Sequence, residues 1–139
     1  VNGVRSQPER VTIEWEAPGL FFHSGDRAVV QNQDWTLNSR TNPAAVGSIA
    51  VAYWTGQGYS TPFIMVGAPA PFEPLARAAC AVRLTVGGRA AEVVYAGLTP
   101  GFLGLSQATF RIPELKAGDH ALSISCGGNV SNSALISVR

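Results

Sequence analysis

The chain contains few of the residues that catalytic and metal-binding sites use most often. Among its 139 residues are two Cys, two His and one Met, and only 14% of the residues are charged. Two cysteines are too few for a structural zinc site, and they lack the Cys-x-x-Cys spacing of a redox motif. His23 and His120 lie in unrelated segments, without the spacing of paired zinc ligands. We therefore expect neither a metal nor another cofactor.

Long apolar runs and an excess of one charge are also missing. No run of about 18 apolar residues occurs, so the sequence predicts no membrane span. Ten Lys and Arg residues are balanced by nine Asp and Glu residues, which gives a formal net charge of +1. Such a balance provides no basic stripe for phosphates, and we predict that nucleic acid is not a partner.

Short apolar runs separated by turn residues dominate what is present. A chain of this length can bury roughly 70% of its unfolded surface, which is enough for one core. The runs recur about every 8 to 12 residues between Gly, Pro, Asn and Asp, a spacing that predicts an all-β antiparallel sandwich or barrel. The pairs Gly87-Gly88 and Gly127-Gly128 favour hairpin turns. The expected strands are 11–15, 28–31, 48–54, 81–86, 91–96, 106–112, 120–125 and 133–138.

The two cysteines, Cys80 and Cys126, are predicted to form a disulfide, with two buried thiols as the alternative. A bond that closes a loop of about 46 residues stabilises a fold by about 4 kcal/mol on the chain-entropy model. A disulfide requires oxidising surroundings, so it would place the protein outside the cell as a secreted chain.

The two ends of the chain resemble each other. At one ungapped offset, Gly3 falls on Gly128, Val11 on Ile136, and Ile13 on Val138. We therefore predict that residues 1–15, the N-terminal segment, form a strand similar to the one at the C-terminal end of the chain. Residues 16–139 are predicted to form the sandwich domain. Such a surplus strand can extend its own sheet, belong to a preceding module, or add to the sheet edge of another copy.

Several short motifs carry a family resemblance that runs along the whole chain. They are APGLF (17–21), NQDWTLNS (32–39), NPAA (42–45), GS (47–48), YWTG (53–56), VGG (86–88), AEVVYAG (91–97), PG (100–101), GL (104–105) and GGNVSN (127–132). Together they resemble the C-terminal Ig-like β-sandwich domain of uncharacterised secreted acidobacterial proteins. The resemblance implies an Ig-like sandwich of about seven to eight strands with an additional N-terminal strand, and no enzymatic activity. Two features depart from that family: Trp35 stands where glycine is common, and most members are not expected to have the cysteine pair.

No constellation for catalysis stands out. The run HSGD (23–26) has the residue types of a nucleophilic triad, but sequence neighbours rarely reach the required arrangement in space. The segment NQDWTLNS has oxygen-bearing side chains at alternate positions but only one carboxylate. A self-capped Asx turn explains this segment better than calcium. We predict that the chain is not an enzyme.

Two functions remain. The first is an extracellular structural subunit that assembles head to tail into a filament, with Val4, Val11, Ile13 and Trp15 of one copy added to the sheet of the next. The second is a monomeric adhesion module that recognises carbohydrate or a cell surface through aromatic loops, with Trp35 and Tyr59 exposed. The sequence leaves both open.

Overall fold

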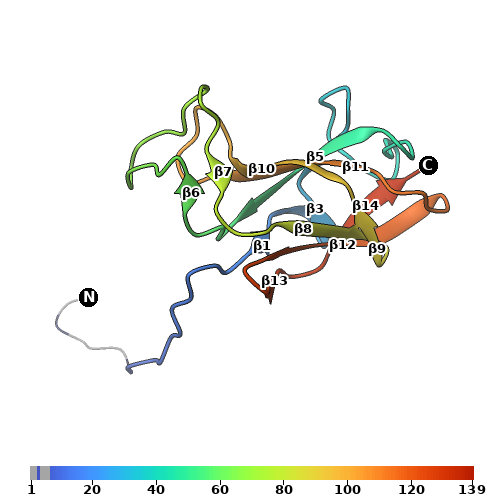
Figure 1. Ribbon diagram of the computed structural model, residues 1–139. Helices are drawn as coiled ribbons and strands as arrows, with labels where there is room; N and C mark the ends of the chain where they lie inside the picture. Colours follow the sequence, from blue (N-terminus) through green and yellow to red (C-terminus); the bar gives the residue numbers. More distant parts are fainter. Residues whose placement is uncertain (1–2, 4–6) are drawn as a thin grey trace.

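The computed structural model describes Gly3 and residues 7–139. These residues form two packed β-sheets joined by long loops, and none of them lies in an α-helix (Figure 1). The predicted all-β sandwich is confirmed.

Each sheet has seven short strands. The first sheet has the order β1 (Gly19–Leu20), β5 (Ile49–Thr55), β11 (Ser106–Arg111), β10 (Val93–Leu98), β7 (Arg77–Ala78), β6 (Ser60–Thr61), with β4 (Val30–Gln31) also on β5. The second sheet has the order β2 (Phe22–Ser24), β3 (Arg27–Ala28), β14 (Ala134–Val138), β12 (Gly118–Cys126), β8 (Arg83–Val86), β9 (Arg89–Ala91), with β13 (Asn129–Val130) also on β12.

The core forms where alternate residues of the two sheets face each other. On β5, Ala52 and Trp54 point inward and are fully buried, whereas Tyr53 between them is on the outer face. Phe110 of β11 and Ile124 of β12 are fully buried in the same core. Complete burial of a large apolar side chain contributes about 1.5 to 3 kcal/mol, so this inward face supplies much of the driving force for folding.

Two predicted strands are each divided between the sheets. Residues 28–31 contribute to β3 in one sheet and β4 in the other, and residues 91–96 contribute to β9 and β10. The chain crosses over at Val29 and Glu92. β3, which precedes the first crossing, lies beside β14 in parallel, with Arg27 opposite Leu135, so the predicted antiparallel sandwich contains one parallel strand pair among the described residues.

Both predicted hairpin turns are confirmed. Gly87 and Gly88 join β8 to β9, and Gly127 and Gly128 join β12 to β13, each as a two-residue loop. All four glycines have positive φ, as the favoured two-residue hairpin turn requires.

The predicted strand at residues 11–15 is absent from the chain's own sheets. Residues 7–18 have no strand pairing, although Val11 and Ile13 keep the alternation of a strand. The reason is that β14, which has the similar sequence, already lies between β12 and β3. Within one copy the N-terminal segment has no equivalent position left to fill.

The predicted disulfide is confirmed. Cys80 and Cys126 are bonded, with their Cα atoms 5.5 Å apart and 46 positions between them in sequence. Cys80 lies between β7 of the first sheet and β8 of the second, and Cys126 ends β12. The bond thus fastens the crossover from one sheet to the other.

We expect the double substitution Cys80→Ala and Cys126→Ala to lower the free energy of unfolding by about 4 kcal/mol, because the unfolded chain gains loop entropy. Urea denaturation with and without reductant measures the loss. The wild-type chain is expected to lose stability in reductant and the double variant to be unaffected by it. Equal stability of the wild-type chain and the double variant, both measured without reductant, would contradict this account.

Candidate functional site

The N-terminal segment is fastened to one end of the sandwich. The Ala17 N–H donates to the Gly56 carbonyl at 2.9 Å, and the Asn129 side-chain amide donates to the Glu16 carbonyl at 2.7 Å. Gly56 has a φ of 80°, and a Cβ there would overlap with the Ala17 carbonyl. Glycine is therefore required where the segment crosses the loop after β5.

A cluster of three tilted aromatic rings holds the segment just before this crossing. The ring centroids of Trp15 and Tyr59 are 5.5 Å apart, and those of Tyr59 and Phe63 are 6.1 Å apart. These rings line a hollow of about 320 Å³. Tyr59 is 53% exposed, as predicted, but it lies against Trp15. Tyr59 thus helps to hold the N-terminal segment against the sandwich. We call Trp15, Tyr59 and Phe63 the anchor of the segment.

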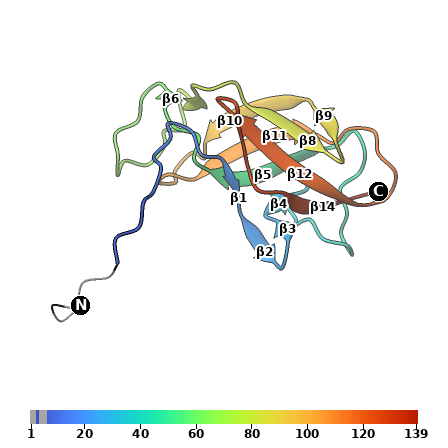
Figure 2. The same cartoon turned by 90° about the horizontal axis from the view of Figure 1, so that it is seen from below.

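Residues 7–14 of the segment project away from the sandwich (Figures 1 and 2). Val11 is 75% exposed and Ile13 is 91% exposed. Val4, the remaining predicted contact residue, lies outside the described residues. An extended stretch with alternating apolar side chains thus stands in solvent, free of its own sheets.

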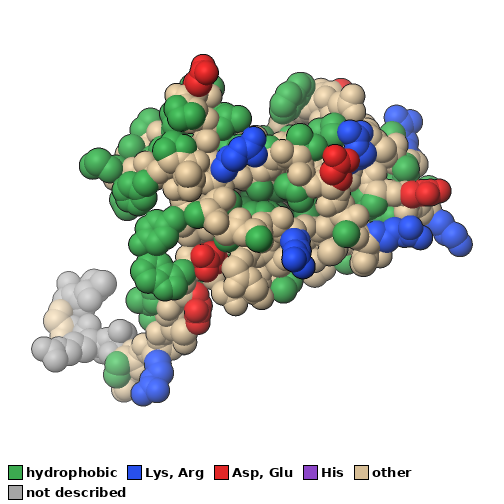
Figure 3. All heavy atoms as spheres, viewed as in Figure 1, with side chains coloured by type: hydrophobic (Ala, Val, Ile, Leu, Met, Phe, Trp, Pro, Cys, Tyr) green, Lys and Arg blue, Asp and Glu red, His purple; other side chains and the backbone are tan. Residues whose placement is uncertain are grey.

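The loop beside this anchor is also apolar. Residues 63–66 are four consecutive apolar residues, and Met65 and Val66 are among the most exposed hydrophobic side chains. Figure 3 shows apolar side chains gathered at this end of the molecule. A run of this kind on a surface is unfavourable unless it has a function.

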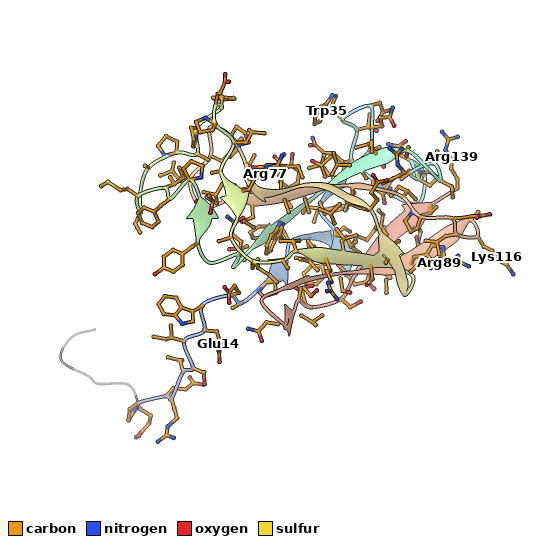
Figure 4. All side chains as sticks on the ribbon, in the orientation of Figure 1. Glu14, Trp35, Arg77, Arg89, Lys116 and Arg139 are labelled. Atoms are coloured by element: carbon orange, nitrogen blue, oxygen red, sulfur yellow. A yellow bond between two sulfur atoms is a disulfide. The ribbon has the colours of Figure 1, made fainter. Side chains whose placement is uncertain are left out.

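The opposite end is charged. Arg89, Lys116 and Arg139 are exposed there, far from Glu14 of the N-terminal segment (Figure 4). The described N-terminal residues and the C-terminal residue lie at opposite ends of the long axis (Figure 1). The two ends therefore differ in chemistry as well as in position.

Asp119 organises a polar network near the charged end. Its carboxylate accepts hydrogen bonds from Arg27 at 3.2 Å, from Ser137, and from Arg40 at 2.6 Å. Hydrogen bonds from Arg27, then from Ser137 and Arg40, hold the pKa of Asp119 well below its usual range. The network joins β3, β12, β14 and the loop after β4.

Trp35 is held in an unusual backbone conformation. It is the single non-glycine residue with positive φ in the described part of the chain, at 67°. Its N–H donates to the Asn32 carbonyl at 2.9 Å, and the Thr36 N–H donates to the Asp34 carboxylate at 3.1 Å. The predicted Asx turn is thus confirmed, and Trp35 is 70% exposed as expected.

An apolar groove of about 520 Å³ lies beside Trp35 on the outer face of the first sheet. Tyr53 and Gln31 form part of its floor, and the Tyr53 hydroxyl donates to the Gln31 side-chain oxygen at 2.6 Å. We call it the Trp35 groove; its lining residues are Phe21, Val29, Gln31, Trp35, Leu37, Tyr53, Phe102 and Leu105.

Sequence reasoning found Trp35 but missed the other walls of this groove. Phe21 and Phe102 come from loops that are distant in sequence, and no periodicity relates them to Trp35. The alternation of β5 was the available signal, because it puts Tyr53 on the face opposite to buried Trp54.

A second groove follows an exposed sheet edge. Within residues 7–139, β7 pairs with β10 at Gly97 alone, so residues 93–96 have a strand partner on one side. We call residues 93–96 the β10 edge. A hollow of about 210 Å³ runs along it, lined by Val82, Val93, Val94 and Arg77 among others.

Neither groove has the residues of a catalytic or metal site. Among the described residues, no three His, Cys, Asp or Glu side chains are grouped to hold a metal ion. His23 and Asp26, from the HSGD run, lie on β2 and in the turn that follows it, outside both grooves. Both grooves are therefore candidate binding surfaces.

No protein-family model and no curated protein matches the chain in sequence. The resemblance to an acidobacterial Ig-like domain therefore stays a prediction. In the described part of the chain, no helix is long and apolar enough to cross a bilayer.

We expect Gly56→Ala to be at least about 2 kcal/mol more destabilising than Gly67→Ala, because overpacking adds to the backbone strain. Gly67 is a matched control, since it has a φ of 84° and open space around it. Thermal unfolding measures the difference. Equal losses would show that the crossing of Ala17 over Gly56 is not tightly packed.

We expect Asp119→Asn to lower the free energy of unfolding by about 2 kcal/mol near pH 7, because charge-assisted hydrogen bonds are lost. The folded pKa of Asp119 lies below its unfolded value of about 3.9, so its contribution is present above that pH and is lost in stronger acid. The difference in stability between the two proteins should begin to shrink as the pH falls below about 4, and it should keep shrinking toward the folded pKa. Urea denaturation across this range tests the trend, and a gap that does not shrink in acid would contradict it.

Proposed function

We propose that this chain is an extracellular Ig-like structural module that assembles head to tail through its N-terminal segment. The observation that carries the proposal is the exposure of alternating Val11 and Ile13, at 75% and 91%, on a segment that its own sheets do not accept. Exposed apolar residues with the pattern of a strand favour pairing with another chain.

The completed sandwich favours addition of a strand over exchange. β14 lies inside the second sheet between β12 and β3, and its Ile136 and Val138 are buried. No strand is missing from the core for a donated segment to replace. The acceptor in this proposal is the β10 edge, where a strand can be added without displacing one.

Charge supports the same pairing. The N-terminal segment is neutral overall, with Arg5 and Arg10 balancing Glu9 and Glu14, but Glu14 lies directly between the apolar residues Ile13 and Trp15. Arg77 lines the hollow along the β10 edge, and exposed Arg83 and Arg89 lie on β8 and β9 of the second sheet.

The acid next to the β10 edge in sequence is already engaged. Glu92, between β9 and β10, forms an ion pair with Arg111 at 3.0 Å. A contact between Glu14 of one copy and an arginine beside the β10 edge of the next would help to fix the orientation of the added segment.

The geometry of such a contact sets the form of the assembly. The contact joins two different surfaces, so it repeats without limit unless its rotation closes a ring. Residues 7–14 project from the sandwich, whereas the β10 edge belongs to the sandwich itself, so each copy has a separate donor and acceptor surface (Figure 2). The disulfide supports an extracellular location.

We expect the wild-type chain to form filaments, and the double substitution Val11→Asp and Ile13→Asp to remain monomeric. Sedimentation velocity and electron microscopy at matched concentration measure the assembly. Thr12→Asp is the matched control, since Thr12 is also exposed and would point to the opposite side from Val11 and Ile13 once the segment pairs as a strand. Added salt should weaken assembly of the wild-type chain, because it screens the charge contacts.

Mixing two variants tests the acceptor. Val94→Lys blocks the β10 edge but keeps the N-terminal segment, and Val94 is 51% exposed, so the fold should tolerate lysine. Each variant alone should stay monomeric, whereas an equimolar mixture with the Val11→Asp, Ile13→Asp chain should give dimers that do not grow. A monomeric wild-type chain at all concentrations would overturn the proposed function.

A further inference from the structure

Burial of the Trp35 side chain does not offset the backbone strain of its positive φ. A positive φ is unfavourable for a residue with a Cβ, and sites that keep such a residue often have a function. Trp35 is 70% exposed, so its indole gains little from the core. The loop nonetheless fixes it: the Asn32 N–H donates to the Thr36 carbonyl at 2.8 Å, closing the turn around Trp35.

The Trp35 groove combines aromatic walls with a polar floor. Trp35, Phe21 and Phe102 stand along it, and all three are exposed. On the floor, the hydrogen bond from Tyr53 to Gln31 fixes both side chains. Gln107 lies directly opposite Tyr53 on the neighbouring strand, on the same outer face.

The polar floor can still form hydrogen bonds with a ligand. The Gln31 amide nitrogen makes a long contact of 3.3 Å with the Trp35 carbonyl, and the Tyr53 hydroxyl oxygen can accept a hydrogen bond while it donates one. Amide and hydroxyl groups beside a flat aromatic surface suit a ligand that has hydroxyls at its edge and C–H groups on its face.

We propose that the Trp35 groove binds a neutral polysaccharide, with one sugar ring on the Trp35 indole and its hydroxyls at Gln31 and Tyr53. The C–H groups on a pyranose face carry a small positive charge, which is attracted to the negative face of an aromatic ring. The volume of about 520 Å³ lies within the usual range of ligand pockets. This site is independent of the proposed assembly.

The lining of the Trp35 groove carries no charged side chain, which favours a neutral ligand over a charged one. All eight residues that line the groove are uncharged. An acidic polysaccharide would bring carboxylates to a surface without a cationic partner, which is costly. The N-terminal segment of a second copy fits less well for the same reason, since Glu9, Arg10 and Glu14 flank its apolar residues.

The same lining favours binding without cleavage. Hydrolysis of a glycosidic bond usually requires two carboxyl groups close to the scissile bond, and none lines this groove. The groove lies on the outer face of the first sheet, where Trp35, labelled in Figure 4, and Phe102 both line it. A polymer can therefore lie across it without presenting a chain end.

Affinity electrophoresis of the full chain in gels that contain xylan, a mixed-linkage glucan or galactomannan tests the proposal, with polygalacturonate as the charged comparison. We expect retardation by at least one neutral polymer and none by polygalacturonate. Calorimetry with the retarding polymer should show at least a tenfold loss of affinity in Trp35→Ala and a smaller loss in Tyr53→Phe. Tyr59→Ala, which removes an exposed aromatic outside the groove, should bind as the wild type does.

A second substitution separates binding from folding. Trp35→Gly removes the ring and suits the positive φ, so we expect an unchanged or higher melting temperature together with the loss of polysaccharide binding. A clear drop in melting temperature would make Trp35 a structural residue and overturn the proposal.

Two further results would also overturn it. One is retardation by none of the neutral polymers. The other is loss of self-association in Trp35→Ala without any polysaccharide binding, which would make the groove a protein interface. Assembly is measured separately by sedimentation, so failure of the filament proposal leaves the result for this groove unaffected.

Discussion

The burial of one face from each sheet is the interaction on which the rest of the structure depends. Trp54 and Phe110 from the first sheet and Ile124 and Ile136 from the second are fully buried in a single core. Because these residues take every second position, their neighbours must lie on the outer faces. Tyr53 and Gln107 are therefore placed on the outer face by the same alternation that buries Trp54, where both are half-buried, and Tyr53 forms part of the Trp35 groove.

The sequence predicted the parts of this fold that follow from local pattern. Short apolar runs between turn residues placed the strands at 48–54 and 106–112 almost correctly, and paired glycines located both hairpin turns. The crossings at Val29 and Glu92 were missed, because an apolar β-branched run looks the same whether it stays in one sheet or changes sheets. The alternation at Val11 and Ile13 predicted a strand, and residues 11–15 do not join either sheet. Periodicity alone cannot show whether a partner strand is available.

The candidate site was predictable only in part for a related reason. Trp35 stood out because a large aromatic residue occupies a polar turn, and its exposure follows from that local context. Phe21 and Phe102 join it through loops whose paths depend on the whole sandwich. Tyr59 is exposed as expected, yet its neighbour is Trp15, a contact across 44 positions that no short-range pattern encodes.

The two proposed surfaces share no lining residue, so one copy can use both at once. Copies arranged along a filament would present the Trp35 groove at regular intervals. Many weak sites on one scaffold hold a long polymer far more strongly than a single site, because each later contact is intramolecular. A structural chain and a polysaccharide-binding surface are therefore compatible roles for one module.

The parallel neighbours of β14 have a consequence for mechanical strength. β14 contacts Arg27 through Leu135 and Ala44 through Val138, and both contacts are parallel. The Ala44 N–H donates to the Ser137 carbonyl at 2.9 Å, and the Arg139 N–H donates to the Ala44 carbonyl at 2.8 Å. A pull that separates the two ends of the molecule draws β14 lengthwise past these neighbours. The hydrogen bonds then bear the load together in shear instead of opening one after another, an arrangement suited to a module under tension.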